Sequence, residues 1–134
     1  MLLLNPKQVT FGSSTWGNVV SIAINRSAKR VLVEWSDAGA HAVLADVPEQ
    51  RVEVVVVQEL LGEDVNTPSP GEQRVLSFTT SPTTTDEATR EVTVTAMVES
   101  VSYEVSTKRG SQRRVTLVAL SADGATDPVA VDDA

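Results

Sequence analysis

The side chains that could carry out catalysis are few and widely spaced. His41 is the only histidine, and it stands between Ala40 and Ala42. A serine hydrolase needs an activated serine near a histidine, and no Gly-x-Ser-x-Gly segment accompanies His41. Cysteine is absent, which excludes thiolate zinc sites, a cysteine nucleophile and a disulfide framework. We therefore expect His41 to be an ordinary strand residue.

Acidic residues occur in close pairs that could in principle act as general acid and base. These pairs are Asp46 with Glu49 and Glu63 with Asp64, but such pairs usually lie in solvated turns and nothing else marks a sugar cleft. The segment Asp123–Asp127 is similar to a calcium loop only superficially, because an EF-hand needs more oxygen ligands, a terminal glutamate and flanking helices. We interpret Asp123-Gly124 as a tight turn. The sequence predicts no metal, no cofactor and no enzyme.

Length and composition fit one folded domain that spans residues 1–134. Hydrophobic residues make up 41% and charged residues 22%, which excludes a disordered chain and a membrane protein. The net charge of −7 disfavours a protein that grips nucleic acid through its phosphates. The apolar opening Met1–Leu4 is too short for a signal peptide, so we expect no export and no membrane partner.

The elements that position these residues are strands. Short valine-rich segments separated by Gly, Pro, Ser, Thr and Asp predict an all-β fold, a sandwich or barrel of mostly antiparallel strands. One short helix is allowed, at Gln58–Val65. The expected strands are Gln8–Phe11, Val19–Asn25, Arg30–Trp35, Ala40–Ala45, Arg51–Glu59, Gln73–Thr80, Glu91–Thr107, Gln112–Ala122 and Val129–Val131.

One long strand changes the side on which its apolar residues lie. In Glu91–Val98 the apolar residues occupy even positions, whereas Val101, Tyr103 and Val105 occupy odd positions. A pattern of period two changes phase only where the strand bends, bulges or switches sheets. We therefore predict a β-bulge near Glu99-Ser100.

Two segments are apolar on both faces, namely Val54–Val57 and Leu117–Leu120. An antiparallel sheet with one wet face does not need this pattern. Either the two strands lie centrally under loops, or another chain covers their outer face. In the second case the candidate subunit interface includes Val55, Val57, Val118 and Leu120.

Charge is distributed unevenly near the C-terminus. Four basic residues surround a predicted hairpin tip at Gly110-Ser111, and the chain after them contains four aspartates and no lysine or arginine. This distribution is either a solvated face or a means of head-to-tail docking between copies. The candidate docking residues are Lys108, Arg109, Arg113 and Arg114.

The segments Val98–Ser106 and Arg113–Val129 resemble the closing strands of bacteriophage tail tube proteins. The order of the preceding elements is also similar, with a valine-rich strand, a loop, a strand opened by Gly71-Glu72 and two long antiparallel strands. The weak helix signal departs from the family, which usually has one helix beside its barrel. A related tail or baseplate protein therefore remains an alternative.

The resemblance implies a structural subunit that forms hexameric rings, stacked into a hollow tube and assembled in the host cytoplasm with other tail proteins. Tubes of this family commonly have an acidic lumen, which lets DNA pass without specific binding, and our lumen candidates are Glu91, Glu99 and Glu104. The competing interpretation is a small monomeric β-sandwich that binds carbohydrate or protein. The aromatic content of 4% gives little support to that interpretation, because such a binding module should expose aromatic side chains.

Overall fold

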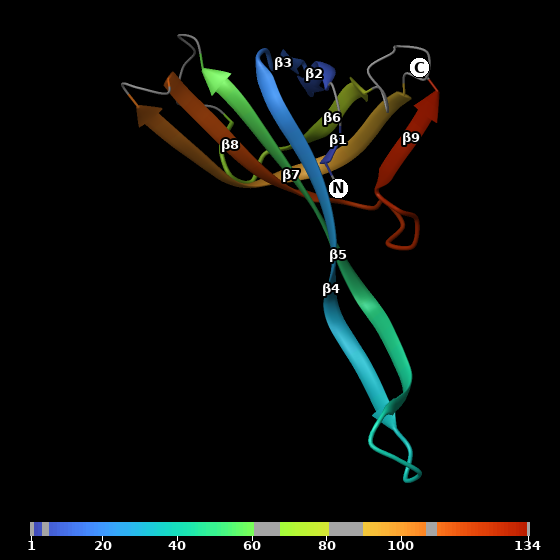
Figure 1. The fold of residues 1–134 in the computed structure, drawn as a ribbon. Helices are drawn as coiled ribbons and strands as arrows, with labels where there is room; N and C mark the ends of the chain where they lie inside the picture. Colours follow the sequence, from blue (N-terminus) through green and yellow to red (C-terminus); the bar gives the residue numbers. More distant parts are fainter. Residues whose placement is uncertain (1, 4–5, 61–67, 81–89, 107–109, 134) are drawn as a thin grey trace.

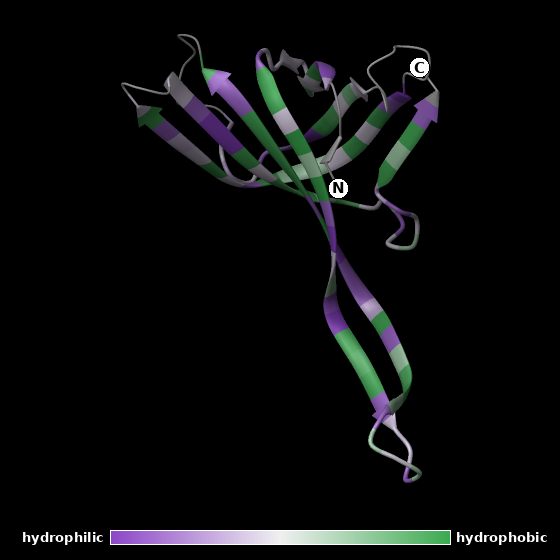
Figure 2. Ribbon diagram, viewed as in Figure 1, coloured by the Kyte–Doolittle hydropathy of each residue, from purple (hydrophilic) through white to green (hydrophobic). Residues whose placement is uncertain are grey.

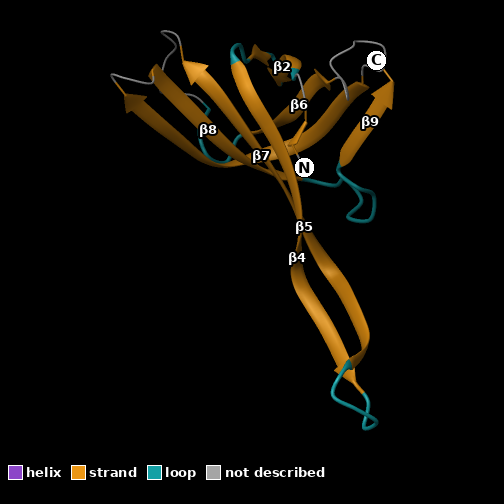
Figure 3. Cartoon of the chain, in the orientation of Figure 1, coloured by secondary structure: helices purple, strands orange, loops and turns teal. Residues whose placement is uncertain are grey.

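A curled antiparallel sheet contains all the strands of the computed structural model, which describes residues 2–3, 6–60, 68–80, 90–106 and 110–133 (Figure 1). No helix occurs within these ranges, which confirms the all-β prediction (Figure 3). Of the proposed helix Gln58–Val65, the first three residues lie in a strand and the rest fall outside the described residues. The strands are β1 (Leu2–Leu3), β2 (Lys7–Phe11), β3 (Ser14–Thr15), β4 (Val19–Trp35), β5 (Ala42–Leu60), β6 (Gln73–Thr80), β7 (Arg90–Ser106), β8 (Gly110–Ala119) and β9 (Val129–Asp133).

The strand order brings distant parts of the sequence together. Hydrogen-bonded neighbours follow the order β1-β4-β5-β8-β7-β6-β2-β3, and β9 pairs with the first half of β7. The pairing of β5 with β8 joins residues 53–60 to residues 111–118. Strands β5 and β8 are therefore interior strands of the sheet, each with a hydrogen-bonded neighbour on both sides.

The core lies on one face of the curled sheet. Strand β5 shows why, because Val52, Val54 and Val56 are buried while Val55 and Val57 point to the other face and remain partly accessible. Side chains from both ends of the strand order meet in the same apolar cluster, which requires the sheet to curl around it. The cluster includes Val9, Phe11, Trp16, Ile22, Ile24, Leu76, Phe78, Val92, Val94, Ala96, Val98, Val115 and Leu117.

The predicted bulge is confirmed in β7. The register with β8 shifts between Val98 and Ser100, so Glu99 is the extra residue. Before the bulge, Val98 is buried on the core side, and after it Val101 packs against the same core. The bulge thus keeps both halves of a 17-residue strand in contact with one core.

Two strands are much longer than the sequence predicted. Val19–Asn25 and Arg30–Trp35 join into β4, and Ala40–Ala45 and Arg51–Glu59 join into β5. The two strands pair from Val19 to Trp35 and extend beyond the rest of the sheet (Figures 1 and 3). We call residues 27–50, which lie past the last pairing of β5 with β8, the arm.

Candidate functional site

The arm carries an apolar face that no other described residue of the chain covers. Val33 pairs directly with Ala45, so their side chains share one face. Alternation places Val31 and Trp35 beside Val33, and Val43 and Val47 beside Ala45. The exposed fractions are 54% for Val31, 61% for Trp35 and 66% for Val43, and Figure 2 shows hydrophobic residues along both strands of the arm.

The opposite face of the arm is mixed. Leu32 pairs with Asp46, and Glu34 pairs with Leu44. Each aliphatic side chain thus stands beside a carboxylate, which is usual for a strand face in contact with water. The face of Val31, Val33 and Val43 is therefore the more apolar of the two faces of the arm.

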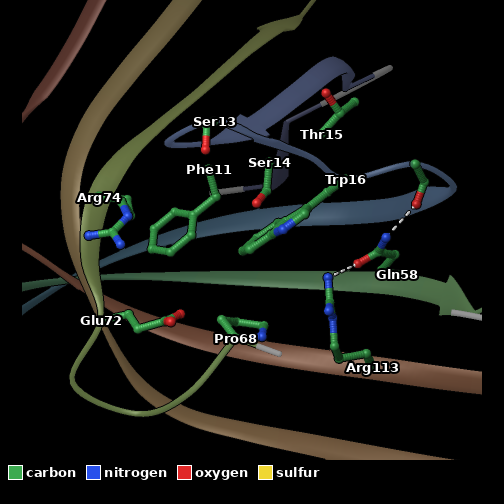
Figure 4. Close-up of a pocket in the computed structure, with 11 residues that line it drawn as sticks. Phe11, Ser13, Ser14, Thr15, Trp16, Gln58, Pro68, Glu72, Arg74 and Arg113 are labelled. Atoms are coloured by element: carbon green, nitrogen blue, oxygen red, sulfur yellow. Dashed lines mark hydrogen bonds between the residues drawn. The ribbon is translucent and has the colours of Figure 1, made fainter. Parts of the chain in front are cut away.

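A pocket lies at the other end of the β4–β5 pair. It has a volume of about 380 Å³ and opens among the β2–β3 turn, the end of β5 and the start of β6 (Figure 4). The rings of Phe11 and Trp16 pack with their centroids 5.1 Å apart at the pocket. Its lining includes Phe11, Trp16, Gln58, Glu72, Arg74 and Arg113.

Arg113 forms one wall of the pocket and is only 5% exposed. Its guanidinium carbon lies 5.1 Å from the centre of the Trp16 ring, which is a cation–π distance. Arg113 Nη2 donates a hydrogen bond to Gln58 Oε1, and Gln58 Nε2 donates to the carbonyl oxygen of Gly17 at 2.6 Å (Figure 4). These contacts hold a positive charge against an aromatic surface.

A second cation, Arg74, is positioned by the turn between β2 and β3. Gly12 has a φ of +64°, and a Cβ atom there would lie 2.7 Å from Arg74 Cδ. Glycine is favoured here for two reasons, the left-handed backbone and the close passage of the arginine side chain. The Gly12 N–H also donates to the Val75 carbonyl at 2.9 Å, which ties the turn to β6.

The proposed interface valines lie on the sheet face opposite the core. Val55 pairs with Thr116, and Glu53 pairs with Val118, so these residues share that face with Val57. Val118 also pairs with Met97 of β7. Leu120 follows the end of β8, where its N–H donates to the Thr95 carbonyl. All four candidates are partly accessible in the chain alone, which leaves their role in an interface as a proposal.

The three lumen candidates also lie on this opposite face. Glu91 lies before the bulge of β7, Glu99 is the bulge residue itself, and Glu104 lies after the bulge, where it pairs with Gln112. Glu91 accepts a hydrogen bond from Ser77 Oγ at 3.2 Å. Glu99 is less free than expected, because its carboxylate binds the guanidinium of Arg51.

Of the four basic residues predicted at one hairpin tip, the two that the structure describes, Arg113 and Arg114, point to opposite faces of β8. Arg114 is exposed, and Gly110 has the positive φ of a turn residue. Arg113 differs from the prediction, because it points to the core side with Val115 and is buried in the wall of the pocket. Lys108 and Arg109 lie outside the described residues, so their part in docking stays a prediction.

The Asp123 loop is a turn, as expected. The Asp123 carboxylate accepts hydrogen bonds from the N–H and hydroxyl of Thr126, the N–H of Ala125 and the hydroxyl of Ser121. These donors, with the Thr126 backbone first, hold the pKa of Asp123 well below its usual value. The N–H of Val129 and then Arg26 lower the pKa of Asp127 in the same loop.

The described part of the chain contains no cluster of three or more residues able to hold a metal ion. Within the same residues, no helix is long and apolar enough to span a membrane.

Sequence reasoning missed the arm and the pocket. The arm left a signal, since residues 25–29 contain neither glycine nor proline and therefore do not favour a turn. The burial of Arg113 could also have been predicted, because Arg113, Val115 and Leu117 occupy alternate positions of one strand and therefore point to the same face. The sequence contains no signal for the pocket, since Gln58 and Arg113 are brought together only by the pairing of β5 with β8.

Comparisons with known proteins find similarity in the fold and none in the sequence families. No family model matches the sequence, and no curated protein matches it. A chain in the virion of a native gene transfer agent particle superposes with a TM-score of 0.57 at 11% identity, covering 96% of this chain and 98% of that one. A chain in the tail of an empty gene transfer agent particle, computed with helical refinement and C6 symmetry, gives 0.56 at 11% identity and covers 100% and 94%. This protein therefore has the fold of chains built into the virion and tail of gene transfer agent particles.

Proposed function

We propose that this protein is a tail tube subunit that assembles into stacked hexameric rings and forms a hollow conduit for DNA. The observation that carries the proposal is the arm, whose apolar face has no cover within the described chain. The resemblance of the C-terminal strands to tail tube proteins and the fold shared with a C6-symmetric tail support it.

Energetics favour a covered arm. Nine residues of strand, 27–35, extend about 30 Å at about 3.3 Å per residue. A two-stranded hairpin is at best marginally stable alone in water. Burial of each valine of the apolar face would contribute about 1.5–3 kcal/mol. An arm of this length therefore becomes rigid when a neighbouring subunit binds it.

Charge supports the conduit. The net charge is −7, and Glu91, Glu99 and Glu104 share the sheet face opposite the core. A wall with such a face toward the lumen would repel phosphates and keep DNA from binding during passage. The function requires no catalytic residues, in agreement with their scarcity in the sequence.

The test compares two pairs of substitutions on the same arm. Val33→Lys with Val43→Lys charges the apolar face, whereas Leu32→Lys with Leu44→Lys places each lysine opposite Asp46 or Glu34 on the mixed face. In negative-stain microscopy at high protein concentration, we expect rings or tubes from wild type and from the Leu pair, and folded monomers from the Val pair.

Two results would contradict the proposal. A wild-type protein that stays monomeric at every concentration would favour the monomeric binding module instead. Normal tubes from the Val33 and Val43 double variant would show that the apolar face of the arm is not an assembly contact.

A further inference from the structure

The tip of the arm and the pocket lie at opposite ends of one pair of strands. Val19 pairs with Gln58, a pocket residue, and Trp35 pairs with Ala42 at the tip. Sixteen residue steps separate these pairs along β4, which is about 50 Å of strand. A contact between the tip of one copy and the pocket of another is therefore head-to-tail, and it repeats along a stack of copies.

The tip presents one aromatic residue that has acidic residues before and after it in the sequence. Trp35 is 61% exposed, and the exposed residues Glu34 and Asp37 flank it. The turn that follows is supported by a hydrogen bond from the Ala38 N–H to Ser36 Oγ at 3.3 Å. An exposed tryptophan on a projecting turn is the kind of side chain that dominates the binding energy of protein interfaces.

The pocket offers the complementary surface. Its volume of about 380 Å³ exceeds that of an engineered cavity of about 150 Å³ that holds benzene. Phe11 and Trp16 supply aromatic surface, and Arg74 and Arg113 supply positive charge (Figure 4). The carboxylate of Glu72 in the lining accepts a hydrogen bond from the Ser69 N–H at 3.2 Å, which partly satisfies that negative charge.

We propose that residues 34–37 at the arm tip of one copy dock in this pocket of a second copy. The Trp35 indole enters the cavity beside Trp16, and the carboxylates of Glu34 and Asp37 face the arginines of the lining. The inference rests on the proposed tail function and deepens it, because it names the surface that receives the arm between successive copies.

Cysteine cross-linking tests this contact directly, since the chain has no native cysteine. Ser14 lines the pocket and is exposed, so the double variant carries Ser14→Cys and Asp37→Cys. A bond within one chain is excluded, because a disulfide requires Cα atoms within about 7 Å. We expect a ladder of dimers, trimers and larger species on a non-reducing gel, whereas either single variant stops at dimers.

A matched double variant carries Thr95→Cys, on the opposite sheet face, with Asp37→Cys. A ladder from this control and none from the Ser14 variant would overturn the proposed docking.

Charge exchange gives an independent measurement. Arg74→Glu alone, and Glu34→Arg with Asp37→Arg, should each slow polymerisation at low salt at least tenfold. The combination of all three should restore the rate, while Arg90→Glu, distant from the pocket, should leave it unchanged. Trp35→Ala should abolish stacking, and Trp35→Phe should retain part of it.

The outcomes separate the two proposals. If wild type forms tubes, and the Trp35→Ala and Arg74→Glu variants form them equally fast, the docking is wrong while the tail function stands. If wild type never associates, both proposals are wrong.

Discussion

Arg26 Nη2 lies 3.1 Å from Asp127 Oδ2, so an ion pair joins the base of the arm to the loop after β8. A cavity of about 490 Å³ separates the same two regions and is lined by Arg26, Pro48 and Asp127, among others. Packing between the arm and the loop is therefore incomplete here. The ion pair is a direct link between the two regions, and we expect it to restrain the direction in which the arm leaves the sheet.

Removal of this link should loosen the arm without unfolding the protein. Both side chains are largely exposed, and such pairs contribute less than about 1 kcal/mol to stability. For Arg26→Ala we expect a nearly unchanged melting temperature. Spin labels on Ser36→Cys and Thr95→Cys should report a broader distance distribution between arm and sheet than in the protein with Arg26.

Arg30→Ala is the control, because Arg30 approaches Glu49 at 4.0 Å within the arm itself. It should leave the distribution unchanged. Equal widths for Arg26→Ala and wild type would mean that the ion pair does not restrain the arm.

The Asp123 carboxylate should keep its charge, and its loop should keep its conformation, at pH values where an ordinary aspartate is already protonated. The hydrogen bonds from Thr126, Ala125 and Ser121 depress the pKa of Asp123, so the folded loop favours the ionised carboxylate. Its stabilising contribution is complete above the unfolded pKa of about 3.9 and is lost as pH falls below it toward the folded pKa. Amide shifts of Ala125 and Thr126 should therefore remain constant down to about pH 4.

The variant Asp123→Asn provides the comparison, since it keeps the size of the side chain and cannot titrate. Its loop amides should show no transition assigned to residue 123. A midpoint at the ordinary aspartate pKa in wild type would mean that the carboxylate does not accept these hydrogen bonds in solution.

Gly12→Ala should destabilise the β2–β3 turn by about 1–2 kcal/mol, the usual cost of a left-handed backbone for a residue with a Cβ atom. The new methyl group would also displace Arg74, because it would lie 2.7 Å from Arg74 Cδ. Chemical denaturation measures the first effect. Gly17→Ala is a matched control at the same pocket, since a Cβ atom there meets nothing within 4 Å.

If Gly12→Ala and Gly17→Ala have the same midpoint of unfolding, the positive φ at Gly12 is not a constraint on the fold.

Local pattern predicted much of the sheet. Val92, Val94 and Val98 occupy even positions, whereas Val101 occupies an odd one. This change was enough to predict the bulge at Glu99, because both halves of the strand must turn their apolar side chains to the same core. The arm could not be predicted in this way. A strand that pairs only with its hairpin partner has the same local sequence preferences as one inside a sheet.

Pro48 lies between the two predicted strands Ala40–Ala45 and Arg51–Glu59, which the structure joins into β5. Proline is rare inside strands, because it cannot donate a hydrogen bond to a neighbour. In the structure the β4–β5 register shifts between Arg30 and Leu32, which pair with Glu49 and Asp46. This irregularity accommodates Pro48 within a strand that has a free edge.

The prediction for Arg113 was wrong for a different reason. Its charge grouped it with the other basic residues, although its alternation with Val115 and Leu117 places it on the buried face of β8.

The pattern of β5 predicts opposite outcomes for two neighbouring valines. Val54 is fully buried in the core, whereas Val55 lies on the opposite face and is partly accessible. Val54→Lys should unfold the protein, because an unpaired buried charge costs several kcal/mol out of a total of about 5–15. Val55→Lys should give a folded monomer that no longer polymerises, if another subunit covers the part of this face around Val55 while the part with Glu91 and Glu104 faces the lumen.

Circular dichroism shows whether each variant is folded, and size-exclusion chromatography shows whether it is a monomer. Tubes of normal length from Val55→Lys would contradict an interface at Val55, and unfolding of this variant would assign Val55 to the core of its own chain.

The lumen assignment is tested by reversing charge at Glu91 and Glu104. Both are exposed on the sheet face opposite the core, and neither is in an ion pair within the described residues. Glu99 is left unchanged, because a lysine there would face Arg51 and add repulsion at the bulge. Exposed carboxylates contribute little to stability, so Glu91→Lys with Glu104→Lys should still form rings.

The assembled variant should retain DNA, because each subunit changes by four charge units toward positive and phosphate binding depends on such charges. We expect DNA to co-sediment with variant tubes at low salt and to be released as salt rises, whereas wild-type tubes retain none at either salt. The same two substitutions to glutamine remove the negative charge without adding positive charge, and should give weak retention. Variant tubes that retain no DNA at low salt would place Glu91 and Glu104 outside the lumen.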